Sequence, residues 1–559
     1  MYILGINCFF HDSSACLLKD EVLIFAIAEE RLSRIKHDRS FPIRSIRECL
    51  KFANIVLEDL DYICFSWNIP VKTGLHNVKT FLLNQRPLTK SHIYATLLQF
   101  TKDIESWGGR RSLFSEFGKV DKKRIIFVDH HESHALSAFT LSGFDSSNIL
   151  VVDGRGATQA TTLGYADKRK YEVLDEALFP NSLGLFYAIF TKYLGFEPNS
   201  DEWKVMGLAP YGIPLNGLLN GLVTANKNLY QINSRYLFGR FPGDMGPLEE
   251  KLGQCRSPES EITERYKNIA ATVQNTLEEI LFSLVSRMID ITGSRNLCLS
   301  GGVALNATAN GKLIRSGLIS NIFIQPAASD DGSAIGAAYG AYWKLGGEIP
   351  IIKMRDVYLG SGFSESQIEE KLKRYNIRYE YHNNIEEVVA DLIASGNIIG
   401  WFQGRSEFGP RALGNRSIIA DPRAEAMKDK VNSCVKFREN WRPFAPAILE
   451  DSAKDYLESY YPSPFMTMTF QVKEDMRKKI PAVVHIDGST RPQAVNKEVN
   501  PRFWRLIKNF ESITGIPVIL NTSFNLRGEP IVCTPEDAIR TFYTSGLDYL
   551  VMENFLIKK

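Results

Sequence analysis

The sequence predicts an α/β protein in two parts, and three observations lead to this fold class. Apolar runs typical of strands alternate with segments of helical periodicity, and polar turns separate them. The chain changes character after a linker marked by Gly346, Gly347 and Pro350. At 559 residues it is also too long for one ordinary domain. We therefore expect one domain over residues 1–348 and a second over residues 349–559.

The first half supplies the elements of this pattern in order. We expect strands at 2–7, 21–30, 61–67 and 124–129, a helix at 45–54 and a second helix that starts at His130. A strand, a glycine-containing loop and a helix follow at 296–316, and the apolar run 321–326 precedes the glycine-rich segment 329–346. Residues 68–120 lack clear signals, and we interpret them as an insertion.

Two stretches of the chain share one pattern, which suggests a duplication. Residues 1–30 run strand, polar turn, strand, turn and strand, and residues 147–175 repeat this order with little sequence identity. Each half of the actin-like ATPase and sugar-kinase folds begins with such a unit. In those folds the turns face each other across a cleft and hold nucleotide phosphates and a metal ion. We therefore expect an actin-like, duplicated N-terminal domain.

Composition and charge exclude several classes of protein. Lys and Arg total 66, Asp and Glu total 64, and the net charge of +2 gives no support for a nucleic-acid coat or a polybasic membrane protein. The eight cysteines form no CxxC pair, which excludes the usual zinc ribbons. No apolar run reaches the roughly 18 residues of a spanning helix, and the N-terminus lacks the basic start of a signal peptide. We expect a cytoplasmic protein without nucleic-acid or membrane partners.

The densest chemical signal is the segment DHHESHA, which holds three of the nine histidines. His130 and His134 are four residues apart and share one helix face, as in two-histidine metal sites, whereas His131 points elsewhere. Taken alone, the motif fits equally well a helix start whose histidines cap the helix or face solvent.

Two aspartates elsewhere in the sequence can complete a metal site with these histidines. Asp153 stands at the end of a buried strand, and Asp330 lies in the ASDDG turn. Each alone fits a turn or a helix cap as well. With His130 and His134 they make a set of two imidazoles and two carboxylates, which favours Fe(II) or Mn(II), with Zn(II) possible.

Two further turns carry polar or flexible residues at strand ends. SGGVALN places Gly301 and Gly302 between a strand and a helix, where backbone N–H groups face a phosphate or nucleotide in many proteins. It matches no standard phosphate motif, so an ordinary tight turn fits it as well. FHDSSA places His11 and Asp12 at the end of the first strand, where an imidazole suits a general base toward a hydroxyl. A capped turn is the alternative interpretation.

The second half is marked by basic residues in loops rich in Gly and Pro. Its first group comprises Arg405, Arg411, Arg416, Arg423, Lys436, Arg438 and Arg442. They do not repeat at helical spacing, and guanidinium groups bind phosphate and carboxylate-like groups through a rigid fork. A small anionic ligand therefore fits better than a DNA groove, with scattered surface salt bridges as the alternative. Arg491, Asn521, Ser523 and Asn525 add polar groups beside apolar strands.

Together these motifs resemble the O-carbamoyltransferase family of the NodU/CmcH type, and the resemblance runs through essentially the whole chain. It is carried, in order, by FHDSSA, AEERLSRIKHD, HHESHA, VVDGRG, KVMGLAPYG, SGGVALN, ASDDGSAIGAA, GRSEFGPRALGNRSI, WRPFAPA, STRPQ and LNTSFNLRGEP. The N-terminal half of that family resembles the TsaD subunit of the tRNA threonylcarbamoyl transferase, which has an actin-like fold. Its C-terminal half resembles the YrdC fold.

The resemblance implies a two-step reaction with ATP and carbamoyl phosphate as co-substrates. The YrdC-like α/β domain would form carbamoyl adenylate, and the TsaD-like domain would transfer the carbamoyl group to a hydroxyl of a small-molecule acceptor, a natural product or a glycan. The family's catalytic histidine falls on His11, beside Asp12.

The resemblance also implies where the ligands bind. The family's metal ligands fall on His130, His134, Asp153 and Asp330, where we expect Fe²⁺ first and Mn²⁺ second. Its nucleotide contacts in the first domain fall on Lys36, Gly302 and Asn306, and we expect Gly301 and Asp153 to join them. Its contacts to carbamoyl phosphate and adenylate fall on Arg411, Lys436, Arg442, Arg491, Asn521 and Ser523.

Other functions explain less of the sequence. A sugar kinase or acylphosphate phosphotransferase leaves the C-terminal arginines without a role. An RNA-directed threonylcarbamoyl transferase predicts a basic face, which the net charge of +2 does not support. A non-catalytic nucleotide-binding scaffold does not need four metal ligands together with His11. We expect residues 68–120 and 213–260 to line the acceptor site, and no motif identifies the acceptor or the oligomeric state.

Overall fold

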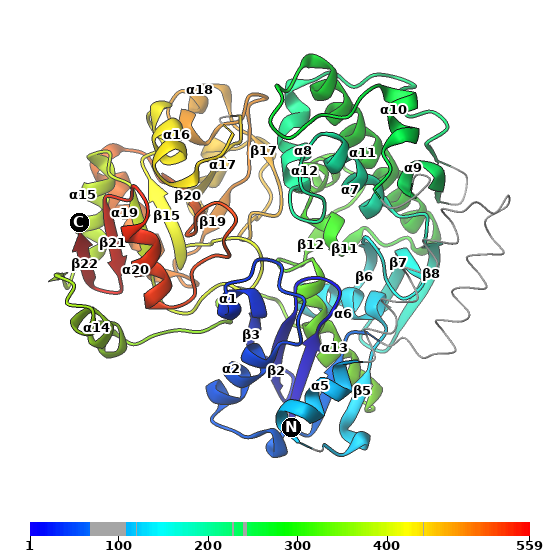
Figure 1. Cartoon of the computed structure of the whole chain (residues 1–559), viewed down its shortest axis with the longest axis horizontal. Coiled ribbons are helices and arrows are strands. Elements are labelled where there is room, and N and C mark those ends of the chain that lie inside the picture. Colours follow the sequence, from blue (N-terminus) through cyan, green and yellow to red (C-terminus); the bar gives the residue numbers. More distant parts are fainter. Residues whose placement is uncertain (68–107, 119, 226–228, 239–242, 440) are drawn as a thin grey trace. The chain divides into compact units, whose positions relative to one another are not determined.

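The computed structural model divides into two compact units (Figure 1). It describes the chain except residues 68–107, 119, 226–228, 239–242 and 440. The first unit comprises Met1–Glu29, His37–Ala309 and Ser316–Met354, and the second comprises Glu30–Lys36, Asn310–Arg315 and Arg355–Lys559. Part of each segment expected to line an acceptor site, 68–120 and 213–260, therefore lies outside the described residues.

Two five-stranded sheets form the core of the first unit, and the first is formed early in the chain. Its strand order is β3 (Val22–Ala28), β2 (Ser14–Lys19), β1 (Tyr2–Asn7), β4 (Tyr62–Phe65) and β5 (Ile125–Phe127). β2 runs antiparallel to β1 and β3, whereas β4 runs parallel to β1 and β5. Helix α2 (Ile43–Ala53) packs its apolar face against β2 and β3.

The second sheet repeats this arrangement with strands from later in the chain. Its order is β12 (Asn321–Ile324), β11 (Asn296–Ser300), β6 (Ser146–Val152), β7 (Gln159–Asp167) and β8 (Tyr171–Leu178). β7 runs antiparallel to β6 and β8, and β11 runs parallel to β6 and β12. The same order and the same strand directions in both sheets confirm the predicted duplication and the actin-like class of the N-terminal half.

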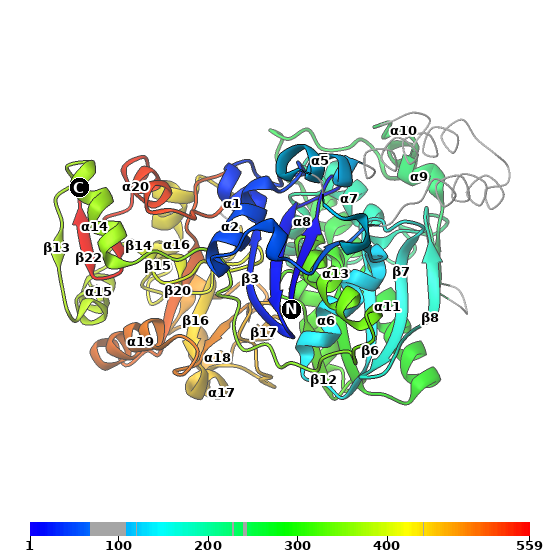
Figure 2. The same cartoon turned by 90° about the horizontal axis from the view of Figure 1, so that it is seen from below.

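Two buried helices join the sheets of the first unit. Helix α13 (Asp330–Lys344) contacts β1, β2 and β4, helix α6 (His130–Ser142) contacts β6 and β11, and the two helices pack on each other (Figure 2). Small residues allow this close approach. A Cβ atom on Gly336 would lie 1.6 Å from the Ser133 carbonyl oxygen, so only glycine fits at this crossing.

The carboxyl ends of parallel strands determine where polar side chains gather in the first unit. β6 and β11 are parallel neighbours with Val151 opposite Ser300, so they end at the same edge of the sheet. Asp153 directly follows β6, and Gly301 directly follows β11. The N-termini of α6 and α13 are brought to the same place by the helix packing described above.

The second unit is built on a mixed sheet of eight strands among its described residues. In order these are β13 (Glu380–Tyr381), β22 (Phe555–Lys558), β21 (Tyr549–Met552), β14 (Ile399–Phe402), β15 (Arg416–Ala420), β20 (Val518–Ser523), β16 (Ala445–Leu449) and β19 (Gln493–Val495). Helices α15 (Ile385–Ala394) and α19 (Pro501–Thr514) pack together, and α20 (Pro535–Tyr543) contacts β14 and β21. This arrangement confirms the α/β class predicted for the C-terminal half.

Local boundaries differ from those predicted. The strand expected at 21–30 ends at Ala28, because Glu29 begins the short helix α1 (Glu29–Ser33) and its buried carboxylate accepts hydrogen bonds from Ser45. After β11 a 3₁₀ turn precedes helix α12 (Ala307–Arg315). Among the described helices, none is both long enough and apolar enough to cross a lipid bilayer.

The packing of α6 on α13 yields a stability prediction. Gly336→Ala is expected to lower the free energy of unfolding by roughly 2–3 kcal/mol, because the Ser133 carbonyl cannot move without separating the helices. Gly340→Ala on the same helix is the matched control, since its Cβ would meet a Val128 side-chain carbon at 2.9 Å, which can adjust. Thermal unfolding followed by circular dichroism measures both, and equal midpoints would contradict the packing argument.

Candidate functional site

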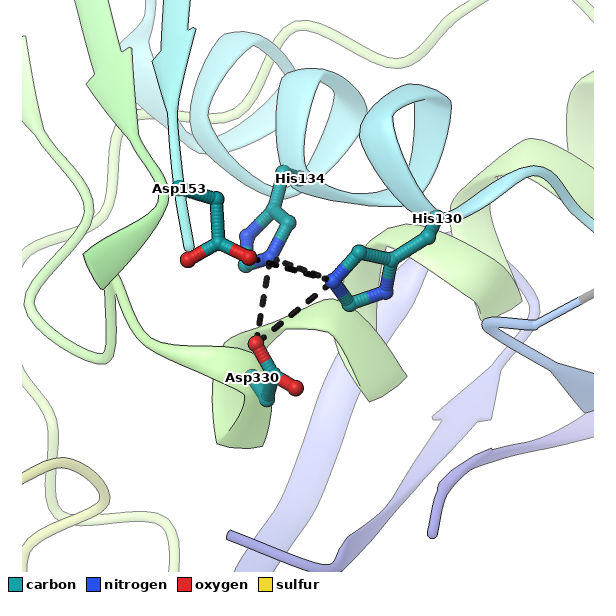
Figure 3. A group of neighbouring side chains, drawn as sticks. All are labelled: His130, His134, Asp153 and Asp330. Carbon is teal, nitrogen blue, oxygen red and sulfur yellow. Dashed lines mark hydrogen bonds and ion pairs between the residues drawn. The ribbon is translucent and has the colours of Figure 1, made fainter. Parts of the chain in front are cut away.

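Four side chains predicted as metal ligands converge in the first unit (Figure 3). The Nε2 atoms of His130 and His134 lie 3.1 Å apart. The Asp330 Oδ1 atom is 3.5 Å from the first of these nitrogens and 3.6 Å from the second. The Asp153 Oδ2 atom lies 3.7 Å from His130 Nε2. One atom from each side chain thus faces a common centre, and these atoms all lie within 4.8 Å of one another.

Local structure fixes the direction of each of these side chains. Asp129 caps α6 by accepting hydrogen bonds from the backbone N–H groups of its first turn, so the helix begins at His130. The Nδ1 atom of His134 lies 3.2 Å from Ser300 Oγ on β11. The Gly302 backbone N–H donates to Asp153 Oδ1 at 3.0 Å, whereas Oδ2 faces the centre and also accepts from the Arg155 backbone N–H at 3.4 Å. Such outer contacts orient ligand groups in metal sites.

The electrostatics of the cluster fit a bound cation. All four side chains are buried. Burial alone would raise the pKa of Asp153, but hydrogen bonding and the charge of the two histidines lower it below its usual range. Burial likewise lowers the pKa of His130, but Asp330 and Asp153 raise it more, to about 9. Two converging imidazole nitrogens and two carboxylate oxygens form a donor set suited to Fe(II) or Mn(II).

His131 lies outside the cluster, as its helical spacing predicts. Its Nδ1 atom lies 2.8 Å from the Thr162 hydroxyl on β7, so the ring turns away from His130 and His134. Burial and the neighbouring His130 lower the pKa of His131 to about 3, so the ring is neutral at physiological pH. It therefore serves as a matched control for the metal ligands.

His11 and Asp12 form a second cluster in the same unit. His11 Nδ1 lies 2.8 Å from Asp12 Oδ2, and His11 Nε2 lies 3.0 Å from the backbone oxygen of Asn199. Both partners are acceptors, so both ring nitrogens carry hydrogen. Burial lowers the pKa of His11, but the Asp12 carboxylate raises it more, to about 10. In this state His11 is an imidazolium and donates hydrogen bonds, which differs from the expected general base.

The residues predicted to contact nucleotide do not all lie in one unit: Gly301 and Asn306 belong to the first unit, and Lys36 belongs to the second. Gly301 has a φ of +87°, and a Cβ there would lie 2.4 Å from the Val152 oxygen, so the turn after β11 requires glycine. Asn306 caps α12 by accepting from the Ala309 N–H, and its amide also pairs with the Gln274 amide. Lys36 is exposed and belongs to the second unit, so it is not among the residues that the first unit brings together.

Cationic side chains gather in the second unit with little compensating negative charge. They are Arg411, Lys436, Arg438, Arg442 and Arg491. Burial and the neighbouring Arg411 and Arg438 hold the pKa of Arg491 well below its usual range, and burial lowers that of Arg411 to about 10. Within the described part of the chain, neither of these two guanidinium groups has a hydrogen-bond or ion-pair partner. Uncompensated cations of this kind call for an anionic ligand.

Of the remaining predicted residues, Asn521 and Ser523 lie on β20, Lys436 contacts the end of this strand, and Arg442 pairs elsewhere. The Lys436 ammonium donates to Asn525 Oδ1 at 2.8 Å and to the Ser523 hydroxyl at 3.3 Å. Asn521 donates to the Gln493 side chain at 3.0 Å, and its own Oδ1 is buried without a partner among the described residues. Arg442 forms an ion pair with Glu439 at 3.3 Å. Lys436 is thus in contact with Ser523. Burial lowers the pKa values of Arg491 and Lys436, and Arg411 lies close enough to Arg491, and Arg442 to Lys436, to lower them further.

Three arginines of the same sequence group have structural roles. Arg416 is fully buried, stacks 3.6 Å from the Phe402 ring centroid and donates to backbone oxygens. Arg423 forms an ion pair with Asp421 at 2.6 Å. Arg405 donates to backbone oxygens. For these three, an internal role replaces the ligand role that the basic composition suggested.

The structure places two further residues in these clusters: His37, for which the sequence suggested no role, and Arg438, which the sequence placed in the basic group without a specific ligand contact. His37 contacts Asp12 at 2.8 Å, and the motif AEERLSRIKHD contains it. Arg438 stacks 4.0 Å from the Phe444 ring centroid, and its Nη2 atom is buried without a partner among the described residues. The density of basic residues around Arg438 was the available signal, whereas nothing in the spacing indicated the His37 contact.

Comparison with protein families assigns both units. The model described as "Carbamoyltransferase N-terminus" matches residues 2–339, and the model described as "Carbamoyltransferase C-terminus" matches residues 390–559. The chain belongs to the carbamoyltransferase family. Carbamoyltransferases move a carbamoyl group to an acceptor. The functions of the two clusters described above are therefore considered for this activity.

Several curated relatives match this carbamoyltransferase over nearly its full length. An uncharacterized protein of Synechocystis sp. is 40% identical over 100% of this chain and 97% of its own. Nodulation protein NolNO of Sinorhizobium fredii is 40% identical over 99% of this chain and 80% of its own. An uncharacterized protein of Methanocaldococcus jannaschii is 34% identical over 100% of this chain and 99% of its own.

Solved structures show weaker similarity. HypF of T. kodakarensis matches 61% of this chain and 47% of its own at 14% identity, with a TM-score of 0.34. A ROK hexokinase from Thermus thermophilus matches 62% of this chain and 100% of its own at 14% identity, with a TM-score of 0.29. These scores are too low to carry an argument, so the fold assignment rests on the strand topology.

The four-residue cluster yields a prediction about metal content. His134→Ala removes one of four converging donors and is expected to lower bound metal by at least about tenfold, while His131→Ala keeps it. Elemental analysis after reducing, chelator-free purification measures both. Equal loss in the two variants, or no divalent metal in the wild type, would remove the metal site from this account.

Proposed function

We propose that this carbamoyltransferase works in two stages, with carbamoyl adenylate as the intermediate. The second unit would form the adenylate from carbamoyl phosphate and ATP, and the first unit would transfer the carbamoyl group to a hydroxyl of a small-molecule acceptor. The observation that supports the proposal most directly is the group of cations around Arg411 and Arg491, which has no compensating protein anion at either guanidinium among the described residues.

The first stage needs a site for several negative charges at once. Water attacks the phosphorus of carbamoyl phosphate, and the bond between phosphorus and the carbamate oxygen breaks to give carbamate and inorganic phosphate. A carbamate oxygen then attacks the α-phosphorus of ATP, and pyrophosphate leaves. Apart from water, every species in this sequence is anionic. Arg411 and Arg491 offer guanidinium forks for phosphate oxygens, and the Asn521 side chain can hydrogen-bond the carbamoyl group. Lys436 holds the end of β20 in place through its contacts to Ser523 and Asn525.

The second stage exchanges one bond to the carbamoyl carbon for another. The acceptor oxygen forms a bond to this carbon, the bond to the adenylate oxygen breaks, and AMP and a proton are released. We propose that His11 donates from Nε2 to the oxygen on which negative charge develops, after the substrate replaces the Asn199 carbonyl. A divalent cation held by His130, His134, Asp153 and Asp330 would supply Lewis-acid stabilisation of the phosphate and carbonyl oxygens.

The rival functions fit these observations less well. A phosphotransferase with the actin-like fold would use the first unit and leave the cations of the second unit without a ligand. An RNA-directed transferase would need a basic surface, and the near balance of 66 basic and 64 acidic residues does not favour one. We infer a small-molecule hydroxyl acceptor, and a mass gain of one carbamoyl group in an acceptor screen would identify it.

The division of labour can be tested with arginine variants. Arg491→Ala or Arg411→Ala is expected to cost roughly 2–5 kcal/mol in adenylate formation, because each removes a charged fork from an anionic substrate. Pyrophosphate release dependent on carbamoyl phosphate measures this step. Transfer from supplied carbamoyl adenylate should persist in both variants.

Arg423→Ala is the matched control, since this arginine of the same unit is already paired with Asp421. It should form adenylate at close to the wild-type rate. If supplied adenylate fails to restore transfer in Arg491→Ala, or if the wild type carbamoylates an acceptor without ATP, the two-stage proposal is wrong.

A further inference from the structure

A chain of hydrogen bonds links two histidines through one carboxylate in the first unit. His11 Nδ1 lies 2.8 Å from Asp12 Oδ2, and His37 Nδ1 lies 2.8 Å from the other oxygen, Asp12 Oδ1. The two imidazole rings are 4.9 Å apart between centroids. His37 lies 25 residues from Asp12 in the chain, so the contact is made by the fold and not by a local turn.

The surrounding residues fix each member of this chain from the other side. His37 Nε2 lies 3.2 Å from the Ser200 hydroxyl, beside the Asn199 oxygen that faces His11. The Ser329 hydroxyl, one residue before Asp330, donates to Asp12 Oδ2 at 3.2 Å. Both oxygens of the Asp12 carboxylate thus accept hydrogen bonds, Oδ1 from His37 and Oδ2 from His11 and Ser329.

The Asn7 side chain holds the backbone of the same turn. Its amide donates to the carbonyl oxygens of His11 and Asp12 at 2.9 and 3.1 Å. The Ser66 hydroxyl and the Trp67 indole N–H donate to the Asn7 Oδ1 atom at 2.8 and 3.0 Å. The turn that carries His11 is therefore anchored to the first sheet.

Three residues of this network adopt left-handed backbone conformations. Asp12, His37 and Asn199 have φ values of +44°, +55° and +61°, in the left-handed region that residues with a Cβ rarely adopt. Three such residues come from three distant segments and meet in one network. Conformations of this kind persist where the surrounding structure holds them, and they cluster at functional sites.

We propose that His37 is a positioning residue of the transfer centre, which holds the Asp12 carboxylate so that Asp12 in turn fixes the direction and protonation of His11. This inference rests on the proposed function, because it assigns His11 a role in carbamoyl transfer. His37 itself stays one carboxylate away from the reacting atoms, since its Nδ1 atom faces Asp12 and its Nε2 atom faces Ser200.

Hydrogen bonding explains the contacts better than a second metal ion. Each imidazole nitrogen lies 2.8 Å from a different oxygen of Asp12, which is an ordinary distance for a charge-assisted hydrogen bond. Without His37, Oδ1 loses the donor that the described residues provide. The carboxylate is then free to turn about its terminal torsion, which has a broad energy profile, and the His11 ring loses its fixed partner.

The first test reads the hydrogen bond directly. In the wild type, nitrogen-15 labelling of the nine histidines should show a low-field Nδ1–H proton of His11 that is protected from exchange with water. His37→Leu should broaden or abolish this signal. His37→Asn places an amide N–H near the position of Nδ1 and should restore it. A signal equal in the wild type and His37→Leu overturns the inference, and so does an Asn variant that behaves like Leu.

The second test reads the transfer step. AMP release from supplied carbamoyl adenylate, with water as the acceptor, should fall about 10- to 100-fold in His37→Leu and recover partly in His37→Asn. Pyrophosphate release in the second unit should stay unchanged. Ser40→Ala is the control, because among the described residues the Ser40 hydroxyl bonds within its own turn, to Asp38. Transfer in His37→Leu at the wild-type rate overturns the inference.

Two further outcomes separate this inference from the proposals on which it rests. A wild type that transfers the carbamoyl group neither to water nor to any acceptor of the screen contradicts the proposed function, while the imidazole signal still tests the His37 contact. A second divalent ion in the wild type that is lost in His37→Leu but kept in His134→Ala makes the His11, Asp12 and His37 group a metal site, and overturns the positioning role.

Discussion

The placement of two buried carboxylates is the constraint on which the first unit depends. Asp153 and Asp330 lie where burial opposes negative charge, and such groups are retained only where positive charge or hydrogen-bond donors meet them. The paired strand ends of β6 and β11 and the packed helices α6 and α13 provide this by bringing His130 and His134 to the same point. The close approach at Gly336 is part of the same constraint, since a wider helix crossing would separate the histidines from Asp330.

The second unit holds a group of buried cations instead. Its cations come from the turn before β15, a π-helical turn that ends at Lys436, the loop between that turn and β16, and the segment between β17 (Phe470–Gln471) and β19. Glu439 is the carboxylate that pairs with this group among the described residues. In the first unit the histidines meet the charge of the two carboxylates, whereas Arg411 and Arg491 have no such partner among the described residues. The phosphate-bearing substrates that we propose as ligands of the second unit carry the charge that these arginines lack.

Much of this arrangement follows from the sequence, and the reasons are local. Helical spacing alone puts His130 and His134 on one face and turns His131 away, and the end of an apolar run puts Asp153 at a strand terminus. The repeated order of strands and turns predicts the duplicated sheets. These predictions succeed because they depend on periodicity within a single element.

The features that the sequence did not indicate depend on contacts between distant segments of the chain. His37 reaches Asp12 through a residue with positive φ, and no spacing rule encodes that turn. Basic composition did not distinguish Arg416, whose charge is met by backbone oxygens, from Arg411, whose charge is not. The protonation of His11 also depends on the Asn199 carbonyl, which comes from a segment 188 residues away.

The central claim, that the carbamoyl group passes through an adenylate, is tested most directly by following oxygen. Carbamoyl phosphate labelled with oxygen-18 in its carbamate oxygens is supplied with unlabelled ATP, and the released AMP is analysed by mass spectrometry. Because a carbamate oxygen attacks the α-phosphorus and stays with it when the carbon–oxygen bond breaks, the account predicts one labelled oxygen in each AMP. AMP without the label, alongside carbamoylated acceptor, would contradict it.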